Sequence, residues 1–596
     1  MKETVPKTIA QLKDKLFINT AYDIRAYVGT PGRFFDPANA VLTPEAMRVA
    51  GVLMGSMPFN LAGGEIIQLT PGDSVVIGYD NGPTSKALAD GFAKGLSEQG
   101  ITVYNIGLSS SGQVYHNETQ LKAQGHVQIT RSHVEITTNG AKFAVKGQGI
   151  HTYLLGQMNE ALNKDTIGRD TDEVKVTDKT EEGLKLYTDK MIVRYSDYFA
   201  KHPRSVAVNL FGGTGLKYKE LFEKILGNVT IIGDTINVNS GKLLADPTRF
   251  EMLPMVPGFH MALKRGQRVH SFDLDADRGS VTEGLMVFEP DGTGHYLGDS
   301  LAHIVADYKL NIVLPALMNT LASKNLPAGQ ADIIHRIAAT VYVDPRYTGG
   351  VPAFVEKNGG YVAYHPKGHS LWKDTMTNNM KKLAKLANYT SVAGFVKETN
   401  YQDMQIEASL HLFVTGADDG IPRDDAIENV FILEKLFDTL KIKTLAEYFA
   451  KLPRRFATKE IRTGASTNSQ KVNITKDVII SLKEAFSPEK YTIIEFEGQI
   501  RVEWNSGFIM YGMSNTSPKL TFMVEGSTKN ERNQALAYIL ALHNSMKKKH
   551  RDRLPLDFGE NRFFLEDKSY NLTNPDRINF GDIRAVEFMK KHGLTV

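Results

Sequence analysis

The chain has 596 residues, of which 42% are hydrophobic and 23% are charged, a balance typical of folded globular proteins rather than disordered ones. This length corresponds to about four domains. The net charge of +3 gives no reason to expect a nucleic-acid or membrane partner. There is no cysteine, which excludes disulfides, thiolate metal sites and cysteine nucleophiles.

The N-terminal residues do not resemble a targeting segment. They lack the apolar core of a signal peptide, and no stretch of about 18 apolar residues occurs anywhere in the chain. The densest basic run, residues 547–551, is short, and we expect it to be the solvated end of a helix. The sequence therefore predicts a cytoplasmic protein that binds neither membrane nor nucleic acid.

The first two-thirds of the chain alternates between apolar β-branched runs and helical patterns. Residues 74–79 predict a strand, residues 84–99 a helix with Thr84 as its N-cap, and residues 101–107 the next strand. The same alternation recurs as a predicted strand at 205–211 and a predicted helix at 216–226. Further short strands are expected at 311–314, 339–343 and 361–364. Strands that alternate with helices indicate parallel sheets with helical crossovers.

The final third has a different pattern. Antiparallel strands are expected at 491–498, 507–512 and 519–525, followed by a helix at 528–546. The predicted fold is α/β, with three mixed-sheet α/β/α domains of similar topology followed by an α+β C-terminal domain. The expected domains are residues 1–190, 191–300, 301–435 and 436–548, with a C-terminal extension, 549–596, to which the pattern assigns no role.

Three carboxylates at alternate positions mark a candidate metal site. Asp273, Asp275 and Asp277 would share one side of an extended segment, and oxygen-only ligands favour Mg²⁺ or Ca²⁺ over zinc. An EF-hand loop also begins with this spacing, but it requires glycine and glutamate where this chain has Arg278 and Gly284. A polar turn with three solvated aspartates remains the alternative.

A second candidate segment is Thr130-Arg131-Ser132-His133, which follows an apolar run at 126–129 and precedes Lys142. A serine is a poor nucleophile unless a base takes its proton or it is already phosphorylated. No G-x-S-x-G elbow surrounds Ser132, so a hydrolase triad is not supported. Taken alone, Ser132 would be an ordinary loop serine.

A third candidate segment, residues 514–519, offers hydroxyls, an amide and an ammonium between two predicted strands, a composition that can hold a phosphate. A simple hairpin turn accounts for it equally well. The chain contains no Walker A loop and no G-x-G-x-x-G after a strand, which argues against a P-loop kinase and a Rossmann dehydrogenase.

Taken in order, these segments resemble the α-D-phosphohexomutase superfamily, especially its phosphoglucomutase/phosphomannomutase branch. The likeness runs from about residue 18 to about residue 545. It is carried by Tyr22-Asp23-Ile24-Arg25, by Ser132-His133 with Asn139-Gly140 and Lys142, by Asp273 to Arg278, by Lys367-Gly368-His369-Ser370, by Glu407 to His411, by Asp418-Asp419-Gly420 and by Ser514 to Pro518.

The sequence departs from that family pattern at several positions. Arg131 stands where the phosphoserine loop usually has alanine, and Gly82 stands where an arginine is common. Leu410 replaces a glycine of the sugar loop, and a leucine adopts a positive φ only at a cost. Gly512 replaces an arginine that would bind phosphate through two parallel hydrogen bonds.

The resemblance implies an isomerase that interconverts hexose 1-phosphate and hexose 6-phosphate, of glucose or mannose or both. The phosphoryl group would pass through a phosphoserine at Ser132, with hexose 1,6-bisphosphate as intermediate and activator. Mg²⁺ would be held by Ser132, Asp273, Asp275 and Asp277. The only partner expected is a small sugar phosphate, with the enzyme a monomer or a homodimer.

The same resemblance implies the site residues. The catalytic group would be Ser132, His133, Lys142, Arg25 and Arg278. The substrate-binding group would be His369, Glu407, Ser409, His411, Ser514, Asn515, Thr516, Ser517 and Lys519. Two alternatives remain open: an amino-sugar phosphate mutase of the same fold, and a non-catalytic homologue that binds phosphosugars.

Overall fold

The structure is a computed structural model, and it describes residues 23–36, 38–162, 175–241, 243–247, 252–283, 286–288, 294–296, 331–347, 349–366, 368–407, 409–443, 455–458, 461–496, 498–513, 519–552, 554 and 575–594. The chain divides into two compact units. The first comprises Met1–Leu285, Leu297–Ala306 and Gly368–Thr444, and the second comprises Met286–Tyr296, Asp307–Lys367 and Leu445–Val596.

The first unit begins with a mixed seven-stranded sheet in the order β1-β9-β8-β6-β7-β11, with β10 paired to β9. Parallel pairing joins β6 to β7 and β8, and β7 to β11, whereas β9 runs antiparallel to β8 and β1. The strands are β1 (Ile24–Tyr27), β6 (Ser74–Tyr79), β7 (Thr102–Leu108), β8 (Gly125–Ile129), β9 (Thr138–Val145), β10 (Gln148–Gly149) and β11 (Val176–Asp178). Two small hairpins accompany them, β2 (Gly29–Thr30) with β3 (Arg33–Phe34), and β4 (Phe59–Asn60) with β5 (Ile66–Ile67).

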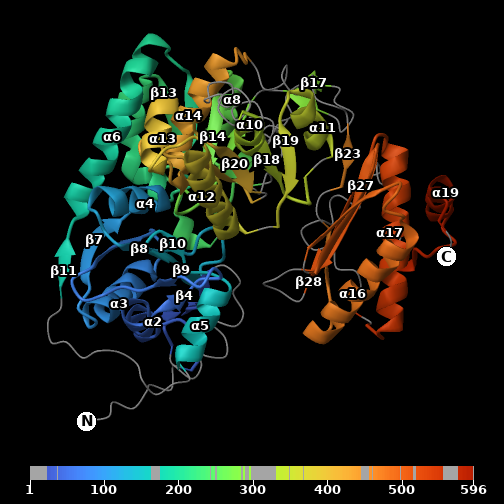
Figure 1. The fold of residues 1–596 in the computed structure, drawn as a ribbon, viewed down its shortest axis with the longest axis horizontal. Helices are drawn as coiled ribbons and strands as arrows, with labels where there is room; N and C mark the ends of the chain where they lie inside the picture. Colours follow the sequence, from blue (N-terminus) through green and yellow to red (C-terminus); the bar gives the residue numbers. More distant parts are fainter. Residues whose placement is uncertain are drawn as a thin grey trace. The chain divides into compact units, whose positions relative to one another are not determined.

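Helices cover both faces of this sheet (Figure 1). On one side lie α2 (Pro44–Ser56), α3 (Ser85–Ser97) and α5 (Tyr153–Leu162), and on the other lie α4 (Ser111–Gln120) and α6 (Thr180–Lys201). The alternation of β6 accounts for the two faces, because Val75 and Ile77 pack with Phe92 of α3 while Val76 packs with Val114 of α4. Both faces of the strand are buried, as parallel sheets require.

A second mixed sheet of four strands follows, in the order β13-β12-β14-β15. Its strands are β12 (Val206–Asn209), β13 (Val229–Ile232), β14 (Arg268–Phe272) and β15 (Gly279–Thr282), and only β15 is antiparallel to its neighbour. The accompanying helices are η1 (Thr214–Tyr218), α7 (Lys219–Leu226), η2 (Val238–Ser240), η3 (Leu253–Met255) and α8 (Phe259–Lys264).

The first unit ends with a small antiparallel sheet of β20 (Met404–Glu407), β21 (His411–Thr415) and β22 (Pro422–Arg423). The helices around it are α12 (His369–Leu386), α13 (Val392–Thr399) and α14 (Ala426–Thr439). The side chain of Asp425 caps α14 by accepting from the amides of Ile427 and Glu428. This cap fixes the position of the adjacent residue, Asp424, which belongs to the candidate site.

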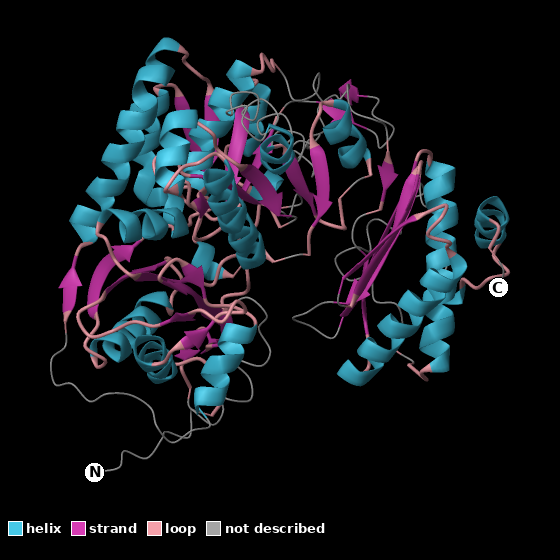
Figure 2. Ribbon diagram, in the orientation of Figure 1, coloured by secondary structure: helices cyan, strands magenta, loops and turns pink. Residues whose placement is uncertain are grey.

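The second unit contains a five-strand path, β23-β28-β27-β26-β25, with β24 paired to β28, and all of its pairings are antiparallel. Figure 2 shows the helices α16 and α17 on one face of that sheet. Its elements are β16 (Met286–Phe288), β17 (Gly294–Tyr296), α10 (Ala331–Ala338), β18 (Thr340–Val343), α11 (Gly350–Lys357), β19 (Tyr361–Tyr364), β23 (Phe456–Ala457), β24 (Ile461–Gly464), α16 (Asn468–Ala485), β25 (Thr492–Phe496), β26 (Gln499–Trp504), β27 (Gly507–Met513), β28 (Lys519–Gly526), α17 (Lys529–Lys549), η6 (Pro575–Arg577) and α19 (Ile583–His592).

The α/β class with mixed sheets is confirmed, and most predicted strands lie within a residue or two of their expected positions. The predicted helix at 216–226 begins as the 3₁₀ turn η1, and strand β26 was not predicted. The predicted strand at 311–314 lies outside the described residues. The four predicted domain boundaries stay a prediction.

The described part of the C-terminal extension belongs to the second unit and packs against its helix α17. Ala585 and Phe588 of α19 belong to the same apolar cluster as Leu536 and Ile539 of α17. Residues 547–551 do end a helix, as predicted, but Lys547 is buried and contacts the carbonyl of Leu554. Among the helices that the structure describes, none combines the length and apolar composition needed to cross a bilayer.

Candidate active site

Three loops of the first unit converge, and each connects a buried strand to an antiparallel partner. The serine loop joins β8 to β9, the aspartate loop joins β14 to β15, and the sugar loop joins β20 to β21. Such loops at the ends of packed strands are where folds of this class place polar side chains on a rigid support.

The serine loop is held in a tight conformation. Ser132 has a φ of 52°, a left-handed value that costs a non-glycine residue about 1–3 kcal/mol. Its amide donates to Thr130 Oγ1 at 2.7 Å, and Thr130 Oγ1 in turn donates to Asp80 Oδ2 at 2.8 Å. The amide of Arg131 donates to the same Asp80 oxygen at 2.9 Å. Asp80 at the end of β6 thus anchors the loop that carries Ser132.

Arg131, which departs from the family pattern, is buried with 1% exposure. Its guanidinium donates to the carbonyl oxygens of Val134 at 2.8 Å and Val238 at 3.1 Å, so it joins the serine loop to the second sheet's loops. A Cβ on Gly82 would lie 2.7 Å from Ser85 Oγ and 3.5 Å from Arg131 Cδ. The distance to Arg131 is an ordinary van der Waals contact, so the space that Gly82 leaves open is the one needed by Ser85 and by Asp80 Oδ1, which would lie 2.9 Å from the added Cβ.

Arg25 also supports the serine loop. Its Nη1 donates to the carbonyl oxygen of Thr130 at 2.7 Å, and its Nη2 pairs with Asp23. Arg25 is thus brought to the site, as the sequence predicts, at the strand β1 that borders Asn139 and Gly140.

The aspartate loop is a turn and not the extended segment that the spacing predicts. Ala276 has a φ of 52°, and Leu274 and Ala276 are buried in apolar clusters while the three aspartates face inward to the site. The ligand oxygens of Asp273, Asp275 and Asp277 lie within 4.8 Å of one another, and all three side chains are fully buried. The convergence comes from the turn, which rotates successive carboxylates toward one point.

These carboxylates fit a hard divalent cation. Asp275 Oδ1 and Asp277 Oδ1 are buried and have no hydrogen-bond partner among the described residues, although orphaned buried acceptors are rare. Burial, together with the charges of Asp277 and Asp275, raises the pKa of Asp273 well above its usual range. A cation among the three carboxylates would remove that repulsion, and oxygen-only donors select Mg²⁺ or Ca²⁺.

Ser132 and Asp273 meet directly. Ser132 Oγ donates to Asp273 Oδ2 at 3.1 Å, and His133 Nδ1 also lies 3.1 Å from Ser132 Oγ. Burial, reinforced by Arg278 and Arg25, lowers the pKa of His133 well below its usual range. The imidazole is therefore neutral, and because Arg278 Nη1 donates to its Nε2 at 3.3 Å, its proton is on the Nδ1 that faces the serine.

Lys142 projects from β9 toward the same carboxylates. Its Nζ lies 2.9 Å from Asp275 Oδ2 and also contacts Asp277. Burial alone would lower the pKa of Lys142, but Asp275 and Asp277 raise it above its usual range. Lys142 is therefore a buried ammonium that neutralises two of the three aspartates.

The sugar loop adopts a conformation that its sequence disfavours. Leu410 has a φ of 68°, contrary to the expectation that leucine would avoid a positive φ. Its amide donates to the carbonyl of Glu407 at 2.9 Å, and its carbonyl accepts from the amide of Gly279 at 3.2 Å. These bonds and the burial of the Leu410 side chain offset the strain, and they attach the sugar loop to the aspartate loop.

Glu407 and Ser409 lie in this loop as predicted. The amide of Ser409 donates to Glu407 Oε2 at 2.8 Å, and the Glu407 side chain is 3% exposed. The charge of Glu407 also acts on Arg278. The loop therefore brings an acidic group close to the serine and aspartate loops.

Two histidine rings of the first unit stack on each other. The rings of His369, at the start of α12, and His411, at the start of β21, have centroids 5.1 Å apart. Burial, with His411 and Lys142 next, lowers the pKa of His369 well below its usual range. Both ring nitrogens of His411 bond within the protein, Nδ1 to Asp424 at 3.0 Å and Nε2 to Arg278 Nε at 3.1 Å.

The structure brings together Ser132, His133, Lys142, Arg25, Arg278, Asp273, Asp275, Asp277, His369, Glu407, Ser409 and His411. The remaining predicted residues belong to the second unit. Ser514, Asn515, Thr516 and Ser517 lie outside the described residues, and Lys519 is the exposed first residue of β28. Their role in the site stays a prediction.

Several polar residues of the site were not predicted from the sequence. Ser111 Oγ donates to Asp275 Oδ2 at 2.7 Å, and Asp424 accepts from His411 and pairs with Lys373. The acidic pair Asp418-Asp419 was matched to the family, but Asp418 is exposed and pairs with Arg194. The sequence did contain a signal for Asp424, because this residue directly precedes Asp425, the capping residue of α14.

Known proteins that are similar to this chain include phosphoglucomutases and phosphomannomutases. Residues 57–163 match the family model described as phosphoglucomutase/phosphomannomutase, alpha/beta/alpha domain I. A phosphoglucomutase of Neisseria gonorrhoeae is 24% identical over 464 residues, which cover 76% of this chain and 85% of the relative. A phosphomannomutase/phosphoglucomutase of Pseudomonas aeruginosa is 23% identical over 517 residues, which cover 86% and 92%.

The fold is shared with a solved structure of a phosphoglucomutase/phosphomannomutase family protein from Burkholderia thailandensis. The TM-score is 0.65 at 18% identity, and the match covers 89% of this chain and 98% of the other. The matched first domain, the curated relatives and the shared fold agree with the resemblance that the motifs carry. Residues 57–163 therefore match the first domain of the phosphoglucomutase/phosphomannomutase family, and the chain as a whole is similar to proteins of that family in sequence and in fold.

Proposed function

We propose that the protein interconverts hexose 1-phosphate and hexose 6-phosphate, of glucose or mannose or both, with Ser132 as the phosphoryl carrier. The observation that supports this most directly is the 3.1 Å contact between Ser132 Oγ and Asp273 Oδ2 beside a buried, partly unsatisfied carboxylate cluster. A serine held at such a cluster is suited to carry a phosphoryl group whose charge a cation offsets.

The proposed reaction has two balanced halves. A free hydroxyl of the sugar phosphate attacks the phosphorus of phosphorylated Ser132, so one P–O bond forms on the sugar while the bond to Ser132 Oγ breaks. The product of this half is hexose 1,6-bisphosphate. After the sugar reorients, Ser132 Oγ attacks the other phosphate, and the isomeric monophosphate leaves.

One proton moves from the sugar hydroxyl to the serine oxygen in the first half and returns in the second. Lys142, the buried ammonium, is the proposed relay, which gives its proton to Ser132 Oγ and takes the hydroxyl's proton. His133 is neutral with Nδ1–H toward the serine, so its proposed role is to donate a hydrogen bond to that oxygen.

Asp273, Asp275, Asp277 and one oxygen of the Ser132 phosphoryl group would hold Mg²⁺. When bound, the ion would supply positive charge that offsets the charge of the transferring phosphoryl group. Arg278 adds a permanent cation next to His133, and its guanidinium geometry suits phosphate oxygens.

Glu407 and Ser409 are proposed to bind sugar hydroxyls, and residues 514–519 of the second unit are proposed to hold the phosphate that is not reacting. His369 is proposed to line the substrate site beside His411. His411 itself is already bonded through both nitrogens, so its role shifts from direct sugar binding to support of Arg278. The enzyme is proposed to act in the cytoplasm as a monomer or homodimer.

A coupled assay tests this function. Glucose 1-phosphate, mannose 1-phosphate and glucosamine 1-phosphate are supplied separately, each with and without hexose 1,6-bisphosphate and Mg²⁺. Turnover of glucose or mannose phosphate, stimulated by the bisphosphate, is the expected result. Turnover of the amino sugar alone would replace the substrate assignment, and binding without turnover of any sugar would establish the non-catalytic alternative.

A further inference from the structure

A chain of polar contacts leads from the serine loop to other parts of the first unit: hydrogen bonds reach as far as Asp424, and an ion pair joins Asp424 to Lys373. Arg278 Nη1 lies 3.3 Å from His133 Nε2, and Arg278 Nε lies 3.1 Å from His411 Nε2. The guanidinium is therefore held between two imidazole rings. Its orientation depends on what fixes those rings, because a guanidinium binds phosphate oxygens only in its own plane.

The tautomer of His411 follows from its partners. Arginine Nε always carries a hydrogen, so His411 Nε2 must be the unprotonated acceptor and Nδ1 must carry the proton. His411 Nδ1 lies 3.0 Å from Asp424 Oδ2, which accepts that proton's hydrogen bond. In the opposite tautomer, the N–H of His411 Nε2 would face the N–H of Arg278 Nε. His411 Nδ1 would then no longer donate a hydrogen bond to Asp424.

Asp424 is fully buried, and its other oxygen pairs with a lysine. Lys373 Nζ lies 2.5 Å from Asp424 Oδ1 and 4.0 Å from the ring centroid of Tyr115, with its side chain 21% exposed. A buried carboxylate needs a charge partner, and truncation of that partner leaves a costly isolated charge. Lys373 thus keeps Asp424 in place as the acceptor for His411.

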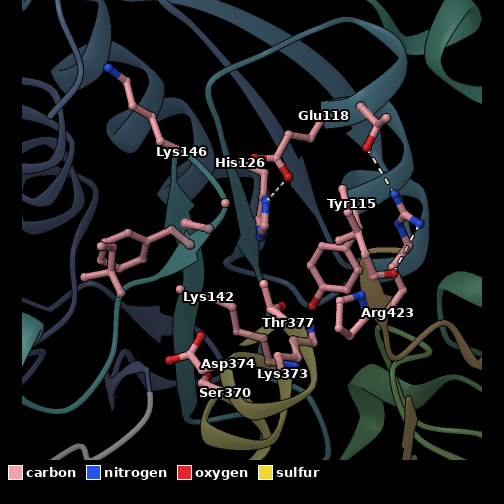
Figure 3. A pocket seen from close by; sticks show the side chains of 18 of the residues that line it. Tyr115, Glu118, His126, Lys142, Lys146, Ser370, Lys373, Asp374, Thr377 and Arg423 are labelled. Atoms are coloured by element: carbon pink, nitrogen blue, oxygen red, sulfur yellow. Dashed lines mark hydrogen bonds and ion pairs between the residues drawn. The ribbon is translucent and has the colours of Figure 1, made fainter. Parts of the chain in front are cut away.

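Lys373 can be reached from a cavity of 490 Å³, shown in Figure 3 between α4 and α12. Tyr115 and Arg423 line one side, and Ser370, Asp374 and Thr377 lie on the helix that carries Lys373. Lys373 is partly exposed because it borders the cavity, whereas Asp424 and His411 are buried.

We propose that Lys373 and Asp424 are positioning residues that fix the His411 tautomer and, through it, the guanidinium beside the serine loop. The proposal rests on the proposed mutase function for its kinetic consequences. Neither residue has a hydrogen bond of its own to the serine or to the predicted metal ligands among the described contacts, so both would act through His411.

Steady-state kinetics of two variants test the consequence for turnover. Lys373→Met keeps the packing on Tyr115 without the charge, and Asp424→Asn keeps the shape of the acceptor. Each should lower kcat by about ten- to a hundred-fold, with KM within about two-fold, because the oriented guanidinium acts on the transferring group. Parent-like kcat in both variants would overturn the proposal.

The matched control is Glu434→Gln. Glu434 is likewise buried, contacts His270 at 2.9 Å and pairs with Arg268 at 2.6 Å, but it has no bond to the serine, aspartate or sugar loops among the described contacts. At a temperature well below its unfolding transition this variant should keep parent-like kcat. A loss equal to that of Asp424→Asn would show that any buried carboxylate matters, and would overturn a specific positioning role.

A double-mutant cycle separates positioning from general stability. Phosphoryl transfer from hexose 1,6-bisphosphate to Ser132 is measured in a single turnover. In an Arg278→Ala background, Lys373→Met should slow this transfer by less than about two-fold, because the group that it positions is gone. If Lys373→Met slowed phosphoryl transfer equally with and without the Arg278 side chain, the proposal would be contradicted.

The cavity allows a chemical rescue. Lys373→Ala leaves a hole that opens to the cavity, and added propylammonium can return an ammonium to Asp424. The amine should restore kcat in Lys373→Ala in a saturable manner, whereas Asp424→Asn and the parent should not respond. Equal stimulation of Asp424→Asn would show a non-specific effect and would count against the proposal.

Nitrogen-15 spectra of histidine-labelled protein test the chain without any activity measurement. The His411 signals are assigned by comparison with His411→Asn. In the parent they should show the Nδ1–H tautomer alone, and in Lys373→Met they should no longer show that tautomer alone. An Nε2–H tautomer in the parent would overturn the proposal even if the mutase is active. Absence of mutase activity with the Nδ1–H pattern intact would instead refute the proposed function alone.

Discussion

Ser132 Oγ and Asp273 Oδ2 lie 3.1 Å apart although 141 positions separate them in the chain. The contact joins the loop after β8 of the first sheet to the loop after β14 of the second. Each loop contains a residue with a left-handed backbone conformation, Ser132 in one and Ala276 in the other. A phosphoryl group on Ser132 would extend directly toward the carboxylate cluster.

Neutralising one carboxylate should weaken metal binding. Asp275→Asn removes a charged ligand from a hard cation, and the loss of mutase activity should be steep because the cluster is fully buried. Titration calorimetry with Mg²⁺ and activity after chelation provide two readouts. Asp418→Asn, at an exposed position outside the site, is the matched control and should bind Mg²⁺ like the parent. A parent that stays fully active after exhaustive chelation would refute the metal assignment.

Glu407→Ala should impair sugar recognition. Loss of a buried acceptor costs about 1–3 kcal/mol, which corresponds to a fall in kcat/KM of roughly ten- to a hundred-fold. The measurement is kcat/KM for each hexose phosphate that the parent turns over. Glu398→Ala, at an exposed position on α13, controls for a change in net charge. Unchanged kcat/KM in Glu407→Ala would remove this loop from sugar binding.

Lys519→Ala tests the proposed phosphate grip of the second unit. Gly512 lacks the side chain that the family uses, and Lys519 is the nearest cation in the sequence to residues 514–517. KM should rise several-fold at low salt, with a smaller effect at high salt because salt screens an exposed charge. Lys490→Ala in the same unit is the control. Equal KM in Lys519→Ala and parent across the salt series would make Lys519 an ordinary strand residue.

The buried pair of Glu434 and Arg268 predicts a pH-dependent stability. Burial alone would raise the pKa of Glu434, but hydrogen bonds from Arg268 and His270 lower it from 4.5 to about 2. A lowered folded-state pKa stabilises the protein above the unfolded value, by up to about 3 kcal/mol. That contribution is lost as pH falls from about 4.5 toward 2.

Thermal unfolding of the parent and Glu434→Gln measures this effect. The difference between their unfolding midpoints should be large at pH 7 and should shrink as the pH is lowered toward 3, because below about pH 4.5 the unfolded chain binds a proton at Glu434 that the folded protein does not yet bind. A midpoint difference that does not change between these two conditions would show that Glu434 contributes packing rather than charge.

The sequence predicts those parts of the fold in which local pattern and burial agree. The β-branched run at 74–79 is buried on both faces, and the aspartate spacing marks the candidate metal loop because three close carboxylates repel one another unless a cation lies among them. The spacing alone gave the wrong geometry for that loop, since the left-handed Ala276 and not an extended strand directs the carboxylates.

Tertiary contacts account for what the sequence does not predict. Asp424 and Lys373 are single polar residues whose partners lie elsewhere in the chain, so no local spacing reveals them. The positive φ of Leu410 is likewise stabilised by bonds to Glu407 and Gly279 that only the folded chain supplies. Propensity gave the wrong expectation there because packing decides the conformation.

The central claim is that Ser132 carries the phosphoryl group, and intact-mass spectrometry tests it most directly. The parent is incubated with hexose 1,6-bisphosphate and Mg²⁺, separated from small molecules and weighed, and the modified residue is located by peptide fragmentation. Ser111→Ala, a second buried serine of the same site, serves as the control. We expect one phosphoryl group on Ser132 in the parent and in Ser111→Ala, and no phosphoryl group in Ser132→Ala, which should also lose nearly all turnover. A Ser132→Ala protein that is still phosphorylated and active would contradict the account.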